Sequence, residues 1–174
     1  NENLYDTNVS SIIISGTTSG VAGPDKVELF LNGNYSNRVG VYYIWEQDES
    51  FVLNITVTET NQIYTAKLTD QFNRIFWDTI IISYYPPATL TIKSPINNSE
   101  TISSSIIISA TTQNTEPGDT VYFYLNNNFY DSRILSSANA NLNFSVQLSN
   151  SANTIVLKLF DQFNEFKYDT IVVF

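Results

Sequence analysis

Two short segments of this sequence repeat the same four residues, and each supplies side-chain oxygens that could bind a cation. The first segment contains Asp70 and Asn73, and the second contains Asp161 and Asn164 at matching positions. Calcium takes about six to eight oxygen ligands, including carboxylate and amide oxygens. Asp and Asn side chains also hydrogen-bond the backbone of their own turn, so a purely structural role is the alternative. Both pairs are therefore calcium candidates.

A second cation candidate is the densest acidic cluster of the chain, which consists of Glu46, Asp48 and Glu49. These residues fall in an expected hairpin loop between two strand-like segments. The alternative is a solvated loop whose acidic side chains bind nothing. The second half of the chain has no equivalent cluster, so a role in cation binding would belong to the first half only.

Aromatic side chains form a third group of candidates. Tyr42, Tyr43 and Trp45 lie along one expected strand, where residues two apart share a face. Tyr43 and Trp45 therefore lie on one face, and an exposed pair of rings could stack on a sugar. Packing in the core is the alternative. Trp77 and Tyr168 occupy matching positions in the two halves, and we predict that they pack in the core or between modules.

The tripeptide Asn-x-Ser/Thr, which accepts N-linked glycans, occurs five times. With 21 Asn and 37 Ser plus Thr in 174 residues, chance alone gives about four to five such tripeptides. The glycosylation candidates are Asn8, Asn34, Asn54, Asn97 and Asn143.

Composition excludes several classes of function. The chain has no His, Cys or Met, which removes the commonest general base, thiolate chemistry and disulfides. It contains neither a glycine-rich phosphate loop nor a nucleophile elbow, so we expect no catalytic residues, no enzyme activity and no cofactor other than calcium. A net charge of −9 without a basic stripe argues against nucleic acid as a partner. No apolar run approaches the ~20 residues of a membrane span, so we expect no membrane insertion.

The elements that position these residues are repeated. Residues 70–82 match residues 161–173 at 7 of 13 positions, and two further blocks match upstream in the same order. Within each half, segments of five to eight residues alternate apolar and polar side chains between turn-forming Asn, Gly and Pro residues, which predicts strands. The predicted strands span residues 11–16, 26–32, 39–46, 51–58, 64–70, 74–83, 89–93, 105–110, 120–126, 130–135, 143–148, 154–161 and 165–174.

This pattern predicts an all-β chain of two tandem immunoglobulin-like β-sandwich domains with about seven strands each. We place the first domain at residues 1–85 and the second at residues 86–174. Pro86 and Pro87 favour a short, stiff connection. We therefore expect the two domains to be held end to end, as a rod.

These segments resemble the immunoglobulin-like repeats of bacterial and archaeal surface-layer proteins, adhesins and multidomain secreted proteins. The matching segments are Thr91–Asn98, Ile106–Thr112, Val27–Gly33, Val121–Asn127, Asn153–Asn164 and Asn61–Asn73. The resemblance implies an extracellular or cell-surface structural protein of a prokaryote, part of a surface layer, stalk or fibre. Its partners would be copies of itself or neighbouring domains of the same protein. An adhesin or a carbohydrate-binding accessory module with a glycan ligand is the alternative.

The first half differs from the second at its beginning. Its first matched strand starts at Ser10, and no counterpart of residues 89–95 fits before it. The first domain is therefore expected to lack its first strand and expose a sheet edge. The alternatives are that the sequence is a fragment cut one strand late, or that residues 1–8 pair irregularly. An uncovered edge is a template for a strand from another chain. A neighbouring subunit that supplied this strand would build a fibre.

Overall fold

The computed structural model describes residues 3–21, 23 and 25–174. The chain divides into two compact units, Asn1–Pro86 and Pro87–Phe174, called unit 1 and unit 2 below. The described residues form fourteen strands and no helix. Every strand predicted from the sequence is present, with ends that differ by a few residues.

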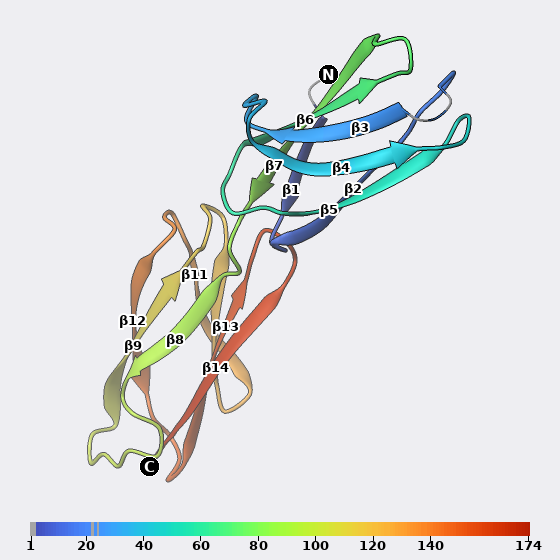
Figure 1. Ribbon diagram of the computed structural model, residues 1–174. Coiled ribbons are helices and arrows are strands. Elements are labelled where there is room, and N and C mark those ends of the chain that lie inside the picture. Colours follow the sequence, from blue (N-terminus) through green and yellow to red (C-terminus); the bar gives the residue numbers. More distant parts are fainter. Residues whose placement is uncertain (1–2, 22, 24) are drawn as a thin grey trace. The chain divides into compact units, whose positions relative to one another are not determined.

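Unit 1 contains two sheets (Figure 1). The larger has the order β1-β7-β6-β3-β4 and the smaller pairs β2 with β5. The strands are β1 Asn3–Thr7, β2 Ser11–Thr17, β3 Asp25–Leu31, β4 Arg38–Ile44, β5 Ser50–Thr56, β6 Gln62–Thr69 and β7 Ile75–Tyr84.

Unit 2 also contains two sheets, one with the order β11-β10-β13-β14 and one with the order β12-β9-β8. The strands are β8 Thr89–Ser94, β9 Ser105–Gln113, β10 Thr120–Leu125, β11 Asn128–Ile134, β12 Ala140–Gln147, β13 Asn153–Phe160 and β14 Phe166–Val173.

The two units arrange their second to seventh strands alike, whereas the first strand lies in the larger sheet of unit 1 and in the smaller sheet of unit 2. The second and fifth strands lie in one sheet, and the third, fourth, sixth and seventh lie in the other. This is the strand arrangement of an immunoglobulin-like sandwich, and it confirms the fold class predicted from the sequence.

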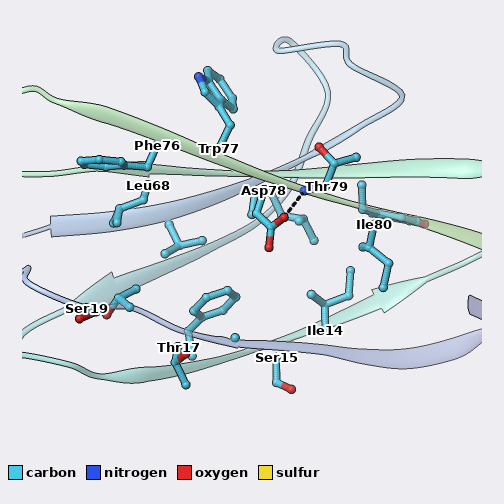
Figure 2. Close-up of a pocket in the computed structure, with 17 residues that line it drawn as sticks. Ile14, Ser15, Thr17, Ser19, Leu68, Phe76, Trp77, Asp78, Thr79 and Ile80 are labelled. Carbon is cyan, nitrogen blue, oxygen red and sulfur yellow. Dashed lines mark hydrogen bonds between the residues drawn. The ribbon is translucent and has the colours of Figure 1, made fainter. Parts of the chain in front are cut away.

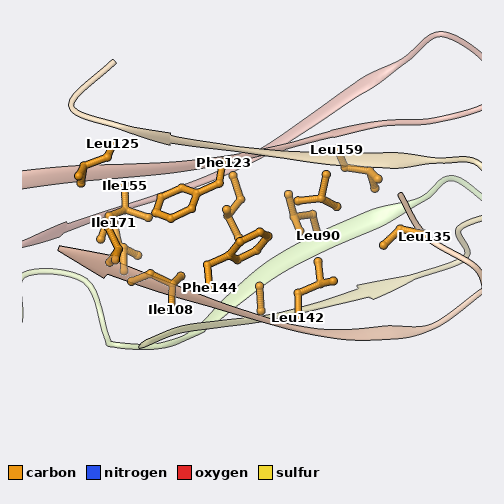
Figure 3. Close-up of a cluster of buried hydrophobic side chains, with 14 of the residues drawn as sticks. Leu90, Ile108, Phe123, Leu125, Leu135, Leu142, Phe144, Ile155, Leu159 and Ile171 are labelled. Atoms are coloured by element: carbon orange, nitrogen blue, oxygen red, sulfur yellow. The ribbon is translucent and has the colours of Figure 1, made fainter. Parts of the chain in front are cut away.

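Each unit has its own core, built by strands whose side chains alternate between the core and solvent. The alternation is regular in β5 and β12, where every second residue is buried. In unit 2, Phe123 of β10 meets Phe144 of β12 between the sheets, with ring centroids 5.2 Å apart (Figure 3). In unit 1 the buried residues include Leu29, Ile44 and Tyr64.

Most of the left-handed backbone positions in the described turns are filled by Asn. Asn73 and Asn164 have φ angles of 59° and 61° in the two matching turns. Asn tolerates this conformation better than most residues with a β-carbon. The turn therefore forms without glycine, while Phe72 and Phe163 hold the preceding position.

Residues before Ser10 form a strand that the sequence analysis did not identify. β1 pairs parallel with β7, from Asn3 beside Ile80 to Thr7 beside Tyr84. β1 thus belongs to the larger sheet. In the described part of unit 1, no strand lies along the side of β2 that faces away from β5.

Candidate functional site

The carboxylate of Asp70 is held by its own turn. Its Oδ1 accepts hydrogen bonds from the backbone N–H groups of Phe72, at 2.9 Å, and Arg74, at 2.8 Å. Its Oδ2 pairs with the guanidinium of Arg74 at 2.6 Å. Burial alone would raise the pKa of Asp70, but these donors lower it below its ordinary value. Asp70 thus stabilises the turn that brings β6 back to β7.

The matching turn of unit 2 repeats this arrangement. Asp161 Oδ1 accepts hydrogen bonds from the backbone N–H groups of Phe163, at 3.0 Å, and Glu165, at 2.9 Å. The N–H of Asn164 donates to the Asp161 carbonyl at 3.0 Å, as Asn73 does to Asp70 at 2.9 Å. Among the described residues, no group of three or more acidic side chains is placed to hold a metal ion. Calcium binding at these turns remains a prediction.

The acidic loop between β4 and β5 is organised around Glu49. Its carboxylate accepts hydrogen bonds from the Tyr42 hydroxyl at 2.7 Å, the Trp45 N–H at 2.8 Å and the Glu46 N–H at 3.2 Å. The Trp45 N–H, the Tyr42 hydroxyl and the Glu46 N–H lower the pKa of Glu49. Asp48 Oδ1 accepts a separate hydrogen bond from the Gly20 N–H at 2.9 Å. Glu49 therefore closes the loop, and Asp48 ties it to the segment between β2 and β3. Cation binding at this loop remains a prediction.

Tyr43 and Trp45 are exposed at the end of β4 and in the loop that follows. The Trp45 side chain is 70% exposed and Tyr43 is 53% exposed. Tyr42, which faces the other way, is half-buried, and its ring lies 6.3 Å from that of Phe51. The exposed pair is compatible with stacking on a sugar ring, as the sequence suggested.

Trp77 and Tyr168 were predicted to pack in the core or between modules. The prediction of core packing is wrong. Trp77 is 49% exposed and Tyr168 is 60% exposed. Each lies on the outer face of its sheet, beside a lysine of the neighbouring strand. Lys67 lies 5.7 Å from the Trp77 ring and Lys158 lies 5.5 Å from the Tyr168 ring. The matching positions therefore repeat an exposed cation–aromatic pair.

Around Trp77, unit 1 adds a shallow hollow that unit 2 does not repeat with the same side chains. The Tyr35 ring lies between Trp77, at 5.2 Å, and Phe30, at 5.4 Å. Glu28 lines the hollow and pairs with Arg38 at 2.9 Å. Burial alone would raise the pKa of Glu28, but hydrogen bonds from Arg38 and Lys26 lower it. Sequence reasoning missed this hollow because Tyr35 lies in a loop between β3 and β4. The alternation of a strand does not predict which way a loop side chain points.

Four of the five glycosylation candidates are exposed, and Asn8 is half-buried. Asn34 and Asn97 accept hydrogen bonds through Oδ1 from the N–H groups of Ser36 and Val172. Asn143 Oδ1 accepts one from the Ser109 hydroxyl. None of these hydrogen bonds uses the side-chain amide nitrogen, to which a glycan would be attached. Glycosylation remains a prediction.

Unit 2 also contains a buried acidic pair that sequence reasoning missed. Asp119 and Asp161 are 4% and 5% exposed. Burial raises the pKa of Asp119 above its ordinary value of 3.8, and the negative charge of Asp161 raises it further, although the N–H groups of Glu116 and Gln162 oppose the shift. The two residues are 42 positions apart, so only the fold brings them together.

We expect Asp119→Asn to be more favourable to stability at pH 7 than at pH 3.5. A raised pKa in the folded state means that Asp119 contributes stability below its unfolded pKa and loses that contribution as pH rises through the folded pKa. An amide cannot ionise, so the variant avoids this loss. Thermal unfolding of the variant and the wild type at both pH values checks the sign. An equal difference at the two pH values would contradict it.

No protein-family model matches this sequence, and no curated protein is similar enough to be counted as a relative. Among the described residues, no helix is long and apolar enough to cross a membrane. The class of protein is therefore defined by the strand order itself. The chain consists of two immunoglobulin-like β-sandwich modules in tandem.

Three solved structures have a similar fold at low identity. Fibronectin(III)-like modules of Clostridium thermocellum CbhA match at 13% identity and a TM-score of 0.41, with 99% of this chain and 88% of that chain covered. Dpr11 IG1 bound to DIP-gamma IG+IG2 matches at 9% and 0.49, with 99% and 94% covered. The BSP domain of a biofilm-associated protein matches at 16% and 0.35, with 97% of this chain and 28% of that chain covered. At these scores the likeness carries no argument about function.

Proposed function

We propose that this chain is a non-enzymatic extracellular structural protein, a component of a prokaryotic surface layer, stalk or fibre whose immunoglobulin-like modules self-associate. The observation that carries the proposal is the tandem repetition of one sandwich with exposed aromatic side chains on both copies. Aromatic residues are enriched where proteins contact one another. The resemblance to prokaryotic surface repeats supports the same setting.

The surface composition also supports an assembling role. Charged residues make up only 14% of the chain, and Asn, Ser and Thr provide much of its polar surface. Low charge density weakens the repulsion that keeps copies apart. Phe72 at the turn between β6 and β7 is 70% exposed, and Phe129 of β11 is 60% exposed. Such side chains are suitable anchors for contacts between copies.

Electron microscopy and sedimentation velocity of the purified chain, over a range of concentrations and with calcium or a chelator, test this proposal. We expect assemblies that grow with concentration. Assemblies that dissolve in the chelator would support a calcium site at Asp70, Asp161 or the Glu49 loop. Discrete monomers under every condition would overturn the proposal of self-association.

The hollow beside Trp77 favours a second candidate, an adhesin or carbohydrate-binding module. Aromatic rings at the surface, flanked by the Glu28–Arg38 ion pair, suit a sugar that stacks through its apolar face and hydrogen-bonds through its hydroxyls. A glycan array with the wild type, Trp77→Ala and the matched control Tyr168→Ala distinguishes the candidates. Glycan retention lost only in Trp77→Ala would support this second function, and no retention by the wild type would exclude it for the glycans tested.

A further inference from the structure

Most of the positive charge of unit 1 gathers at the hollow beside Trp77. Unit 1 carries 10 acidic and 4 basic side chains, which gives it a net charge of −6. Three of its four basic side chains nevertheless surround a single carboxylate, that of Glu28. These three are Lys26, Arg38 and Lys67. The surroundings of Glu28 therefore have a surplus of two positive charges on an otherwise acidic unit.

The Glu28 carboxylate is already paired within this cluster. Its Oε2 lies 3.1 Å from Nζ of Lys26, and its Oε1 accepts a hydrogen bond of 2.9 Å from Nη1 of Arg38. Lys67 lies directly beside Glu28 on the neighbouring strand β6. Glu28 is buried, whereas Lys26 and Lys67 are half-buried and Arg38 is exposed. The acid is thus withdrawn from solvent, and the cations remain accessible.

Unit 2 forms the same sheet face without this cluster. Tyr122 occupies the position of Glu28, and Phe129 occupies the position of Arg38 opposite the preceding strand. Of the three basic side chains, only one has a basic counterpart, Lys158. Burying a carboxylate costs free energy of desolvation that an aromatic side chain avoids. Because unit 2 builds the sheet with aromatic residues instead, folding does not account for the charged cluster.

Aromatic rings complete the hollow. Figure 2 shows the Trp77 side chain on the side of β7 opposite to that of Asp78, so the ring lies on the outer face of the sheet. The exposed Tyr35 ring lies 5.2 Å from it, and Nζ of Lys67 lies 5.7 Å from the Trp77 ring centroid. The hollow has a volume of about 640 Å³, and Arg38 also lines it. Ring surface and two cations therefore lie within reach of one small ligand.

We propose that this hollow binds an acidic saccharide, whose sugar ring stacks on Trp77 and whose carboxylate pairs with Arg38 and Lys67. A hexuronate unit has both features. Arg38 donates to Glu28 through one of its five N–H groups, and a guanidinium can bind a further carboxylate through two of them. The inference rests on the second candidate function above, and it adds the charge of the sugar and the residues that select it.

The rings favour a sugar over other anions. A phosphate or an acidic side chain would pair with the cations but leave the apolar surface of Trp77 and Tyr35 in contact with water. The C–H groups of a pyranose ring can cover that surface while the hydroxyls bond at its edge. Ser36 lines the same hollow and carries a hydroxyl that can donate or accept there.

Isothermal titration calorimetry of the full chain with acidic oligosaccharides and their methyl esters tests the inference. The probes are short oligomers of galacturonate, glucuronate and mannuronate, and each ester retains the sugar ring but has no charge. We expect one acidic oligomer to bind, to bind more weakly as salt is added, and to bind at least tenfold more tightly than its ester. Equal binding of acid and ester would overturn this inference and leave carbohydrate binding intact. Binding of no acidic oligomer would also overturn it, whether or not the glycan array retains neutral sugars.

Two matched variants locate the saccharide. Lys67→Gln removes one positive charge from the hollow, and Lys158→Gln removes the corresponding charge from unit 2. We expect Lys67→Gln to weaken binding about tenfold, which corresponds to the loss of one hydrogen bond to a charged group. Lys158→Gln should leave the affinity unchanged. Equal weakening in both variants would mean that the saccharide responds only to the net charge of the chain, and would overturn the proposal. Circular dichroism confirms that both variants remain folded.

An oligoglutamate peptide of equal charge tests whether charge alone is sufficient. We expect this peptide to bind at least tenfold more weakly than the saccharide, because it has no pyranose ring. Trp77→Ala should weaken binding of the saccharide, and the matched Tyr168→Ala should not. A peptide that bound as tightly as the saccharide would mean that the hollow receives an acidic segment of a protein, such as a second copy of this chain. That result would overturn the assignment to a saccharide.

Discussion

Phe144→Ala is expected to lower the free energy of unfolding of unit 2 by about 3–5 kcal/mol, the range for a large aromatic side chain removed from a core. Phe144 is 1% exposed and contacts Phe123, which is fully buried, across the two sheets. The residues around the lost ring come from both sheets, so they cannot close the cavity without moving the sheets. Chemical denaturation followed by far-ultraviolet circular dichroism measures the loss.

The two tryptophans provide a control for this experiment, because Trp45 and Trp77 both lie in unit 1. Tryptophan fluorescence therefore reports the unfolding of unit 1 alone. We expect Phe144→Ala to leave the fluorescence transition in place, and Leu53→Ala, at the equivalent position of β5, to shift it. If Phe144→Ala shifted the fluorescence transition as much as the dichroism, the units would not unfold independently.

The second large effect is a difference between two equivalent aspartates. Asp169→Ala is expected to destabilise unit 2 by about 1–3 kcal/mol, because it leaves the Ile92 N–H without its acceptor beneath β8. Asp78→Ala is expected to change the stability of unit 1 by less than about 0.5 kcal/mol, because its carboxylate is exposed.

Both substitutions remove the same hydrogen bond to the following residue's N–H, so that loss cancels when the two variants are compared. The remaining difference in the free energy of unfolding comes from the hydrogen bond between Asp169 and Ile92 of β8. Urea denaturation at neutral pH, with fluorescence for unit 1 and dichroism for both units, measures it. Equal losses in the two variants would mean that the contact between Ile92 and Asp169 does not stabilise unit 2.

Local patterns in the sequence were sufficient to predict the fold class. Alternation along segments such as Phe51–Thr56 specifies a face directed to the core, and the repeated blocks require that both halves fold alike. β1 was missed for a physical reason. Its five residues pair parallel with a strand more than 70 positions away and follow no alternation between apolar and polar side chains.

The candidate sites were less predictable, because their properties depend on which sheet face is covered. The repeated segments placed Trp77 and Tyr168 at matching positions, but the repeat could not show that these positions face solvent. The pairing of Asp119 with Asp161 and the hollow around Tyr35 depend on contacts between distant segments. The open side of β2 had one indication in the sequence, because no counterpart of residues 89–95 fits before Ser10.

Unit 1 and unit 2 are sandwiches that differ in one strand, and residue-resolved amide hydrogen exchange of the full chain tests this difference directly. Thr17 in β2 and Thr111 in β9 are counterparts, and Thr111 lies beside Thr91 of β8. We predict slow exchange at Thr111, fast exchange at Thr17, and slow exchange at both Gly16 and Ala110, which bond toward β5 and β12. Slow exchange at Thr17 equal to that at Thr111 would contradict the open edge of unit 1.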